Sequence, residues 1–170
     1  INPYFNHNQE FQGSAIVLFL GVPDSEVEGQ EHSHHQLLQD YEAPLGDGNN
    51  MFISISKKGD LLSAPKGHRS VMISTHCGIT EWKGLSEEAY QAKKADCIQN
   101  LLLLARRVYP ALGKNALVCE LASPRTYQKF TKRTDGSVGG FQQNLKNTNQ
   151  NAVPQDLGLK DFFLVGDNTW

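Results

Sequence analysis

Three histidines lie within four positions of one another beside a glutamate, in the stretch EHSHH at residues 31–35. Imidazole and carboxylate groups bind zinc and similar borderline metals, so this stretch is one candidate metal site. Adjacent residues of an extended segment point to opposite faces, however, and no distant Cys or His pair completes a tetrahedral set. His32, His34 and His35 are better explained by an exposed loop entering a strand or helix, with His35 packing near the QLL that follows. No metal is predicted.

Ser74, His76 and Cys77, with Asp60 upstream, supply the residue types of a hydrolytic triad. A Gly-x-Ser-x-Gly elbow or another local nucleophile signature does not frame them. The stretch ISTHC is instead typical of strand residues that alternate inward and outward. A nucleophilic enzyme is not predicted.

A third candidate is a glycine-rich loop, DGSVGG at residues 135–140. Glycine adopts positive φ and lets the backbone approach something planar or bulky. The loop matches neither the dinucleotide fingerprint Gly-x-Gly-x-x-Gly nor a Walker loop. A plain turn between a short helix and a polar segment explains it equally well.

The chain closes on FFLVGDNTW, residues 162–170, in which an apolar run delivers the carboxylate of Asp167. In open α/β sheets ligands bind at the carboxyl edge of the strands, and a carboxylate there suits a sugar-like hydroxyl. Asp is also a common turn or N-cap residue. The chemistry of the residues alone favours that second role.

Apolar or alternating segments predict strands at Ser14–Val22, Met51–Ser56, Ser70–His76, Ala116–Leu121 and Phe162–Val165. The first is apolar at nearly every position, which predicts a central strand covered on both faces.

A long helix is predicted over Glu87–Tyr109, because Ser86 is a good N-cap and Pro110 ends it. Its apolar residues recur at helical spacing and predict one buried stripe, Tyr90, Cys97, Ile98, Leu101, Leu102, Ala105 and Val108. A shorter helix is predicted from Ser123. The fold class is α+β, a mixed, largely antiparallel sheet with one long helix and one short helix packed on it.

The composition of the 170 residues fits one globular domain. The net charge of −2, with Lys129, Lys132 and Arg133 as the densest basic stretch, argues against nucleic-acid binding. The three cysteines are widely spaced, which predicts a reducing compartment. No apolar segment reaches the roughly 18 residues that span a bilayer. The chain begins at Ile1 without a signal peptide, and we expect it to be an excised piece.

The stretch SPRTYQKFTKRTDGSVGG (123–140), a polar spacer and GLKDFFLVGDNTW (158–170) together resemble the carboxyl-terminal part of phytoene-desaturase-like flavoproteins. These are the carotenoid desaturases and isomerases of the flavin amine oxidase superfamily. In that family a Ser/Thr-Pro-Arg-Thr-aromatic segment leads to a Gly-x-x-Gly-Gly loop, and an apolar strand later ends in Gly-Asp. GSAIVLFLGV, HHQLLQDYE, MFISISKKGD and SAPKGHRSVMISTH resemble substrate-domain segments in the same order, so the resemblance covers most of the chain. The family's amino-terminal Gly-x-Gly-x-x-Gly fold and the Pro-Gly after Gly-Asp are not in the sequence.

The resemblance implies that residues 1–158 are a substrate-domain portion of a larger flavoenzyme and that residues 159–170 are the returning strand of its FAD-binding domain. It implies FAD in the parent protein, with Asp167 bonded to the ribityl or pyrophosphate region. The implied cofactor-binding residues are Gly166, Asp167, Asn168 and Thr169. The implied loop near flavin and substrate comprises Gly136, Val138, Gly139 and Gly140. Arg125 is expected to anchor that loop, and no catalytic residue is predicted.

The resemblance implies an FAD-dependent carotenoid desaturase acting on long polyenes, with a carotenoid cis–trans isomerase as the alternative within the family. A flavin-free module enclosing a small apolar ligand between the sheet and the Leu101–Val108 stripe is the alternative from another class. The isolated chain is expected to lack cofactor and activity. Expected partners are a polyene, the missing amino-terminal FAD-binding domain and a second copy joined through the terminal strand. The parent is expected in the cytoplasm, peripherally associated with a membrane because of its substrate.

Overall fold

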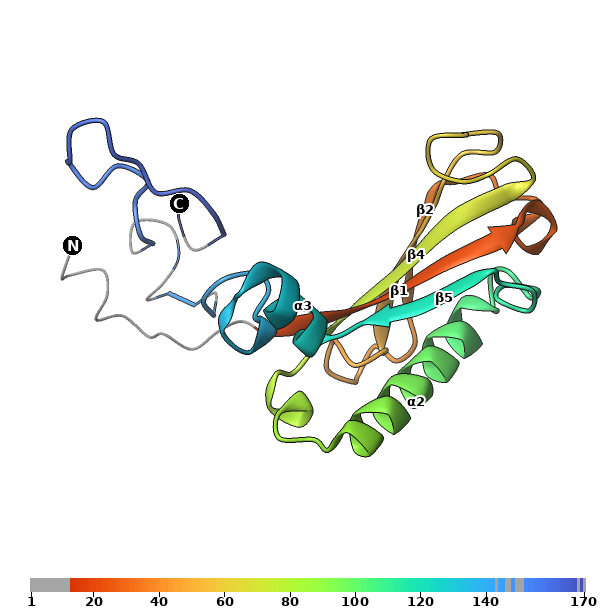
Figure 1. Ribbon diagram of the computed structural model, residues 1–170, viewed down its shortest axis with the longest axis horizontal. Helices are drawn as coiled ribbons and strands as arrows, with labels where there is room; N and C mark the ends of the chain where they lie inside the picture. Colours follow the sequence, from red (N-terminus) through yellow and green to blue (C-terminus); the bar gives the residue numbers. More distant parts are fainter. Residues whose placement is uncertain (1–12, 143, 146–147, 149–151, 168, 170) are drawn as a thin grey trace.

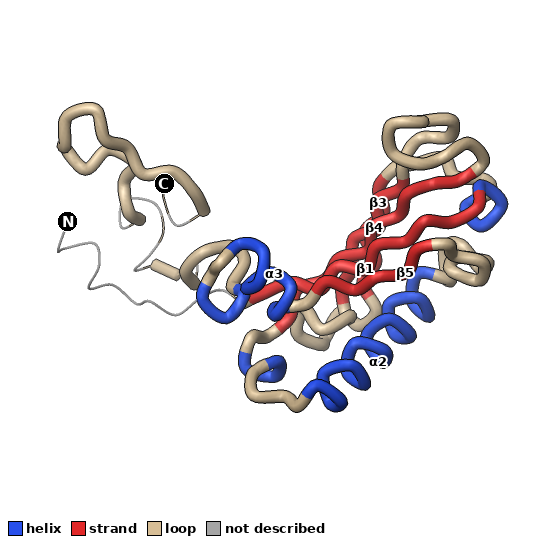
Figure 2. The backbone as a smooth tube through the Cα atoms, in the orientation of Figure 1, coloured by secondary structure: helices blue, strands red, loops and turns tan. Residues whose placement is uncertain are grey.

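The computed structural model describes residues 13–142, 144–145, 148, 152–167 and 169. One sheet forms the centre of the fold, and its strands are β1 (Ser14–Pro23), β2 (His34–Leu38), β3 (Asn50–Ile55), β4 (His68–Cys77) and β5 (Val118–Ala122). The strand order is β2-β3-β4-β1-β5, and every neighbouring pair is antiparallel (Figure 2).

The helices are α2 (Glu87–Ala105) and α3 (Pro124–Thr131), with short 3-10 turns η1 (Asp24–Val27), η2 (Thr80–Trp82) and η3 (Thr134–Gly136). Helix α2 runs along one face of the sheet and α3 lies at one end of β1 (Figure 1). The predicted α+β class, with one long and one short helix on a largely antiparallel sheet, is confirmed.

The core lies between α2 and the sheet face that α2 covers. Leu18, Ile73 and Ile53 stand opposite one another on adjacent strands, and all are fully buried. Leu101 and Leu102 of α2 belong to the same buried cluster. Antiparallel pairing puts directly opposed residues on one face, so the alternating pattern of these strands becomes one continuous apolar layer.

The other face of the sheet is more open than the sequence predicted. Strand β1 does lie inside the sheet, but Phe19 remains 44% exposed. Its cross-strand neighbour Met72 is partly exposed as well. The prediction that β1 is covered on both faces is therefore wrong, because, of the two described α-helices, α2 runs along one face of the sheet and α3 lies only at one end of β1 (Figure 1).

Helix α2 begins as predicted, with the Ser86 hydroxyl accepting a hydrogen bond from the N–H of Ala89 at 3.2 Å. It ends at Ala105, not at Tyr109, and turns carry the chain to Pro110. Proline disfavours helical geometry in the residue before it, so the regular helix stops earlier than the apolar spacing indicates. Val108 consequently leaves the predicted stripe and is exposed, whereas Leu104 is buried.

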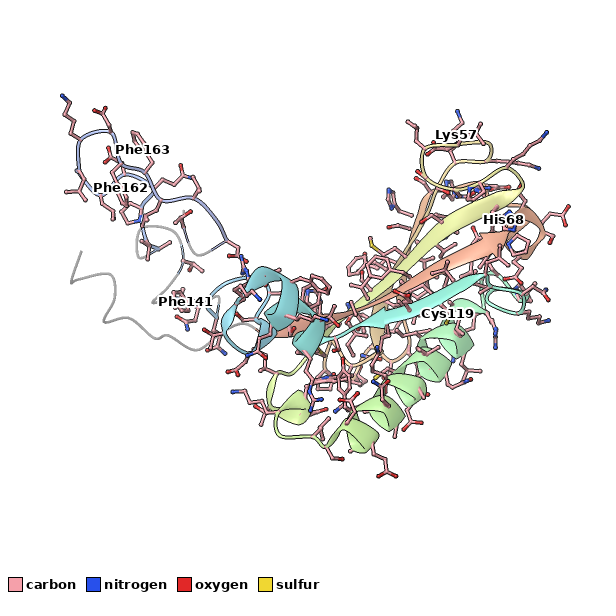
Figure 3. All side chains as sticks on the ribbon, in the orientation of Figure 1. Lys57, His68, Cys119, Phe141, Phe162 and Phe163 are labelled. Carbon is pink, nitrogen blue, oxygen red and sulfur yellow. The ribbon has the colours of Figure 1, made fainter. Side chains whose placement is uncertain are left out.

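The predicted strand at Phe162–Val165 is wrong for the described residues. Phe163 forms one isolated bridge with Asp156, and the N–H of Leu164 donates to Gln155 O at 2.8 Å. A strand needs a neighbouring strand to complete its ladder, and this segment pairs only with its own preceding turn. Phe162 and Phe163 project from a part of the chain that lies beyond α3, away from the sheet (Figure 3).

Candidate functional site

The glycine loop begins at η3 and is anchored to the sheet. Gly136 has φ of 72°, and a Cβ there would lie 1.9 Å from the carbonyl oxygen of Pro124. The Gly136 carbonyl accepts a buried hydrogen bond of 2.6 Å from the Ser14 hydroxyl at the start of β1. The N–H of Val138 donates to Gly13 O at 2.9 Å. Gly136 is thus required for packing of the loop between α3 and β1, whatever lies beyond the loop.

The remaining glycines of the loop turn the chain outward. Gly139 and Gly140 have φ of 87° and 76°, in the left-handed region that glycine adopts without steric cost. Val138 is half-buried, Gly139 is exposed and Gly140 is buried. Gly139 therefore presents its backbone at the surface next to a loop that is firmly held at its other end.

The second predicted segment forms a tight turn. The N–H and hydroxyl of Thr169 both donate to the carbonyl of Gly166, at 3.2 and 2.8 Å. Thr169 also bridges to Val153. A Cβ at Gly166 would meet no atom within 4 Å, so open space adjoins the backbone there. Asn168 lies outside the described residues.

Arg133 brings the two predicted segments together. Its two terminal nitrogens donate to the two carboxylate oxygens of Asp167, at 2.5 and 2.8 Å. The backbone groups of Asp167 and Gly139 also favour the ionised form of this carboxylate. The guanidinium, followed by these backbone groups, holds the pKa of Asp167 below its usual value, whereas partial burial opposes that change. Asp167 is therefore an anchored anionic acceptor beside the loop.

Sequence reasoning missed Arg133 as a site residue. It appeared there only as part of a basic stretch that was too sparse for nucleic acid. Its partner is 34 positions away in the sequence. No local spacing rule connects residues so far apart, and the only available signal was that a cation lies within one resembling motif and an acid within the other.

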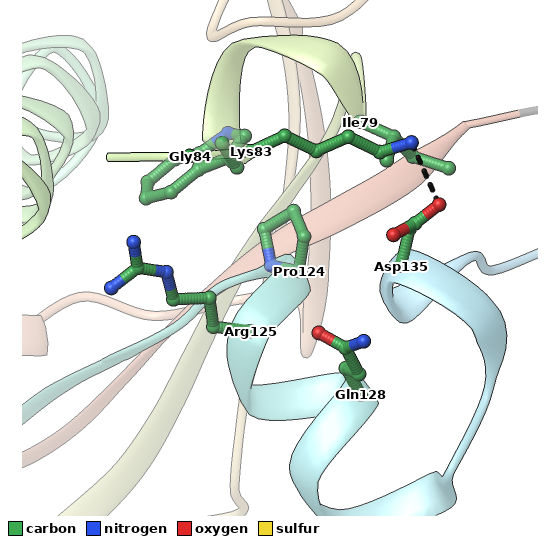
Figure 4. Close-up of a pocket in the computed structure, with 8 residues that line it drawn as sticks. Ile79, Lys83, Gly84, Pro124, Arg125, Gln128 and Asp135 are labelled. Atoms are coloured by element: carbon green, nitrogen blue, oxygen red, sulfur yellow. Dashed lines mark ion pairs between the residues drawn. The ribbon is translucent and has the colours of Figure 1, made fainter. Parts of the chain in front are cut away.

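The other side of the loop borders a cavity of about 290 Å³ (Figure 4). Its wall includes Trp82, Pro124 and Gln128. The ammonium of Lys83 and the carboxylate of Asp135 form an ion pair of 2.7 Å across one edge. The loop is therefore tied to η2 through Asp135, as well as to the terminal turn through Arg133.

Arg125 has a structural role, but at a different place from the one expected. Its guanidinium lies 4.3 Å from the centre of the Tyr90 ring. The same group donates to the carbonyl of Leu85 and approaches Glu87 at 3.5 Å. It thereby holds the start of α2 against α3, and within the part of the chain that the structure describes its hydrogen bonds and ion pair do not reach the glycine loop.

The histidines of the first candidate have protein partners. His34 Nδ1 lies 3.0 Å from the Ser54 hydroxyl, and His35 Nε2 lies 2.8 Å from the Tyr109 hydroxyl. HHQLL forms edge strand β2, so His34 and His35 point to opposite faces. Within the described ranges, no group of three His, Cys, Asp or Glu side chains could hold a metal ion.

The residues of the second candidate do not converge. Ser74 and His76 share one face of β4, whereas Cys77 points into the core. Burial raises the pKa of the Cys77 thiol to about 12, so a thiolate is disfavoured. Asp60 lies in the β3–β4 connection, where it accepts a hydrogen bond of 2.6 Å from the Ser63 hydroxyl. A hydrolytic triad is not formed.

The arrangement around Asp167 suits recognition of a hydroxyl group. An ionised carboxylate is an acceptor only, and it has about four lone-pair positions, of which a bidentate guanidinium uses two. Open space lies beside Gly166 and exposed backbone at Gly139. This arrangement can accept a hydrogen bond from a hydroxyl-bearing ligand, and none of its described residues is placed as a general base.

Comparison with known proteins identifies relatives along most of the chain. No family model matches it. Prolycopene isomerase, chloroplastic, of Arabidopsis thaliana is 30% identical over 160 residues, which are 91% of this chain and 26% of that protein. Prolycopene isomerase 1, chloroplastic, of an Oncidium hybrid cultivar is 26% identical over the same share of this chain, and the Daucus carota prolycopene isomerase is 25% identical.

The chain spans about a quarter of the length of these relatives. All three carry the name of an isomerase. Over 91% of its length the chain is similar to prolycopene isomerases, and the resemblance to the family of carotenoid desaturases and isomerases is confirmed.

Proposed function

We propose that this chain is the substrate-domain portion of an FAD-dependent carotenoid cis–trans isomerase. The observation that carries the proposal is the similarity to prolycopene isomerases along 91% of the chain. The desaturase prediction shares the same family and the same expected cofactor, but the names of these relatives support the isomerase. The flavin would supply the electron chemistry, and this chain would bind and orient the polyene.

The open face of the sheet supports a polyene-binding role. Its exposed apolar side chains come from three adjacent strands and from β5, and they are Phe19, Phe52, Met72 and Val118. Phe19 and Met72 are direct cross-strand neighbours. Aromatic and thioether groups offer a long apolar ligand a broad, polarizable contact surface. Serines such as Ser74 interrupt this surface, so it is apolar along its centre only.

The space named by the alternative binding-module prediction is occupied. Leu101, Leu102 and Ala105 pack directly into the core with the sheet. An apolar ligand between α2 and the sheet would have to displace these side chains, at a cost of several kcal/mol for a well-packed core. The open face offers contact area without that cost, which favours a ligand on the side of the sheet opposite α2.

Cofactor binding is proposed for the Gly166–Thr169 turn and the Gly136–Gly140 loop. The support is the anchored carboxylate of Asp167 beside exposed backbone at Gly139. This carboxylate would accept a hydrogen bond from a hydroxyl of the ribityl chain or of the ribose. The rest of the cofactor would be held by an FAD-binding domain. The relatives are long enough to contain such a domain, because the match covers only 26% of the Arabidopsis thaliana protein.

The location of the longer protein is also a proposal. Among the described residues, no helix combines the length and apolar character needed to cross a bilayer. The relatives are chloroplastic by name, so a plastid is the first location to examine and the cytoplasm the second. Peripheral membrane contact follows only from the solubility of a polyene in lipid.

The test uses the longer protein that carries this chain, loaded with FAD and incubated with prolycopene under reducing conditions. An isomerase yields a product of unchanged mass with altered retention and a shifted absorption spectrum. A second incubation, with an earlier and more saturated polyene, oxidised FAD and a quinone as electron acceptor, tests the desaturase, which yields a product that has lost two hydrogens for each new double bond. Chromatography with mass spectrometry separates these results, and a preparation that binds no FAD and alters neither polyene refutes the proposal.

A further inference from the structure

The guanidinium of Arg133 fixes the orientation of the Asp167 carboxylate as well as balancing its charge. A guanidinium is a planar fork whose paired N–H groups match the two oxygens of a carboxylate. Both contacts with Arg133 are short, at 2.5 and 2.8 Å, so the plane of the Asp167 carboxylate is fixed by the plane of the guanidinium. A lysine at the same place would supply a point charge and no such alignment.

Arg133 is itself placed by rigid parts of the fold. It follows Lys132, which ends α3 in the left-handed conformation at φ of 60°, and it precedes η3. The chain just beyond is fixed by the Ser14–Gly136 hydrogen bond and by the Lys83–Asp135 pair. Among the described residues, the terminal turn reaches back to the preceding segment through the isolated bridge between Thr169 and Val153.

We propose that Arg133 is the positioning residue of this site, and that its two-point pair with Asp167 holds the Gly166–Thr169 turn against the Gly136–Gly140 loop. The glycine-loop motif and the terminal Gly-Asp motif are separate in the sequence. The Arg133 side chain joins them into one site. The inference deepens the proposed function and rests on it in one respect, that the ligand meeting the oriented carboxylate is the hydroxyl-bearing part of FAD.

The carboxylate keeps acceptor capacity while it is paired. Of about four lone-pair positions, the guanidinium uses two. A ligand hydroxyl can therefore donate to Asp167 without displacing Arg133. Positioning and binding are compatible, so Arg133 would remain in place in the loaded protein.

The structural test is amide hydrogen exchange of the 170-residue chain, read by mass spectrometry. Arg133→Gln and Asp167→Asn are each expected to raise exchange about two- to five-fold in peptides covering 134–140 and 164–169, as loss of a surface ion pair allows. The double variant is expected to add nothing further, because both changes remove one interaction. Lys129→Gln, at an exposed position of α3, is the control and leaves both segments unchanged.

A charge exchange separates positioning from ligand recognition. Arg133→Asp combined with Asp167→Arg restores the pair in reverse, and it is expected to return exchange toward the original rate. In the longer protein, the same double variant removes the carboxylate from position 167 and is expected to bind FAD at least about tenfold more weakly. The Arg133→Lys variant is expected to bind FAD with an affinity between those of the original protein and the double variant.

The outcomes divide as follows. Unchanged exchange in 164–169 after Arg133→Gln, or additive effects in the double variant, overturns the positioning role of Arg133. A longer protein that never binds FAD overturns the proposed function, while the exchange results still decide the pairing. Restored exchange together with undiminished FAD binding in the reversed pair overturns the assignment of Asp167 as the ligand's acceptor.

Discussion

At the residue scale, Gly136 shows how a position that resembles a cofactor motif can be required for a purely structural reason. Its Cβ would overlap the carbonyl of Pro124, and its φ lies in the left-handed region. Gly139 has a similar φ but an exposed backbone. The glycines of one loop thus divide into one that packs the loop and one that is available to a ligand.

Gly136→Ala is expected to destabilise the chain by about 3 kcal/mol or more, because left-handed strain adds to the overlap with Pro124. Urea unfolding followed by circular dichroism measures the change. Gly59→Ala is the matched control, since its φ of 78° is similar and a Cβ would meet no atom within 4 Å. It should cost only about 1–2 kcal/mol. Equal losses for the two variants would contradict the packing role of Gly136.

Replacing Asp47 is expected to raise stability, in contrast to replacing Gly136. Desolvation, followed by repulsion from Glu81, raises the pKa of Asp47. A raised pKa in the folded state means that stability is fully present below the usual value of 3.8 and declines as pH rises through the folded pKa. Asp47→Asn removes the charge and retains a residue type that tolerates the observed φ of 49°.

The Asn variant is expected to be more stable than the original at pH 7 by up to about 0.5 kcal/mol, a small value because solvent screens this exposed group. Thermal unfolding across a pH series measures the difference. The gain should shrink as pH falls and Asp47 becomes protonated. A constant difference at all pH values would show that charge is not its cause.

At the element scale, one buried carboxylate joins segments that are distant in sequence. Glu26 of η1 is 3% exposed. Its carboxylate accepts a hydrogen bond of 2.7 Å from the backbone N–H of Gly113 and another from the backbone N–H of Asn115. These groups lie in the connection from α2 to β5, which has no regular hydrogen-bond ladder of its own. Glu26 therefore fixes the entry of the chain into its edge strand β5.

Glu26→Gln replaces one acceptor oxygen with an amide that cannot accept, and is expected to cost about 1.5–3 kcal/mol of stability. Chemical denaturation measures this loss, and hydrogen exchange should rise first around residues 113–118. Glu28→Gln, two positions away and exposed, should stay within about 0.5 kcal/mol of the original. A loss shared by both variants would point to net charge instead of the two backbone bonds.

The sheet illustrates which elements can be predicted from sequence. Strands β1, β3, β4 and β5 were predicted to within about two residues at each end, because apolar alternation is a strong local signal. Edge strand β2 was described only as a loop leading into a strand or helix, since its polar and apolar residues are both largely accessible. Phe162–Val165 had the right composition, but a strand also depends on a neighbour that local composition cannot reveal.

The site was predictable in its parts and not in its assembly. Gly136–Gly140 and Gly166–Thr169 were each proposed on motif resemblance, and their roles in cofactor binding stay predictions. The contact between them depends on Arg133 and Asp167, which approach through the path of the intervening chain. A pairwise contact over such a separation has no signature in one sequence.

At the scale of the whole molecule, two of the places where the described residues expose apolar side chains bear on the proposed function. One is the open face of the sheet around Phe19, and the other is the terminal segment with Phe162, Phe163 and Val165 (Figure 3). Val165 is 87% exposed. Exposed apolar clusters mark surfaces that bury themselves against a partner or a ligand. In the longer protein we expect the FAD-binding domain to cover the terminal segment.

In the isolated 170-residue chain, the terminal segment is expected to drive self-association. Analytical ultracentrifugation at several concentrations should show a growing dimer fraction, because two copies can bury Phe162 and Phe163 against each other. The combined change Phe162→Ser and Phe163→Ser should shift the equilibrium to monomer by about tenfold or more in the dissociation constant, given the apolar area removed.

Leu62→Ser is the control for this experiment, since Leu62 is fully exposed on the β3–β4 connection, far along the chain from the terminal segment. Its removal lowers surface hydrophobicity without touching the proposed contact, so the dimer fraction should not change. Equal loss of association in both variants would indicate general stickiness, and a strict monomer at every concentration would contradict the contact. Addition of the FAD-binding domain as a separate polypeptide should compete with the dimer, because both partners need the same apolar side chains.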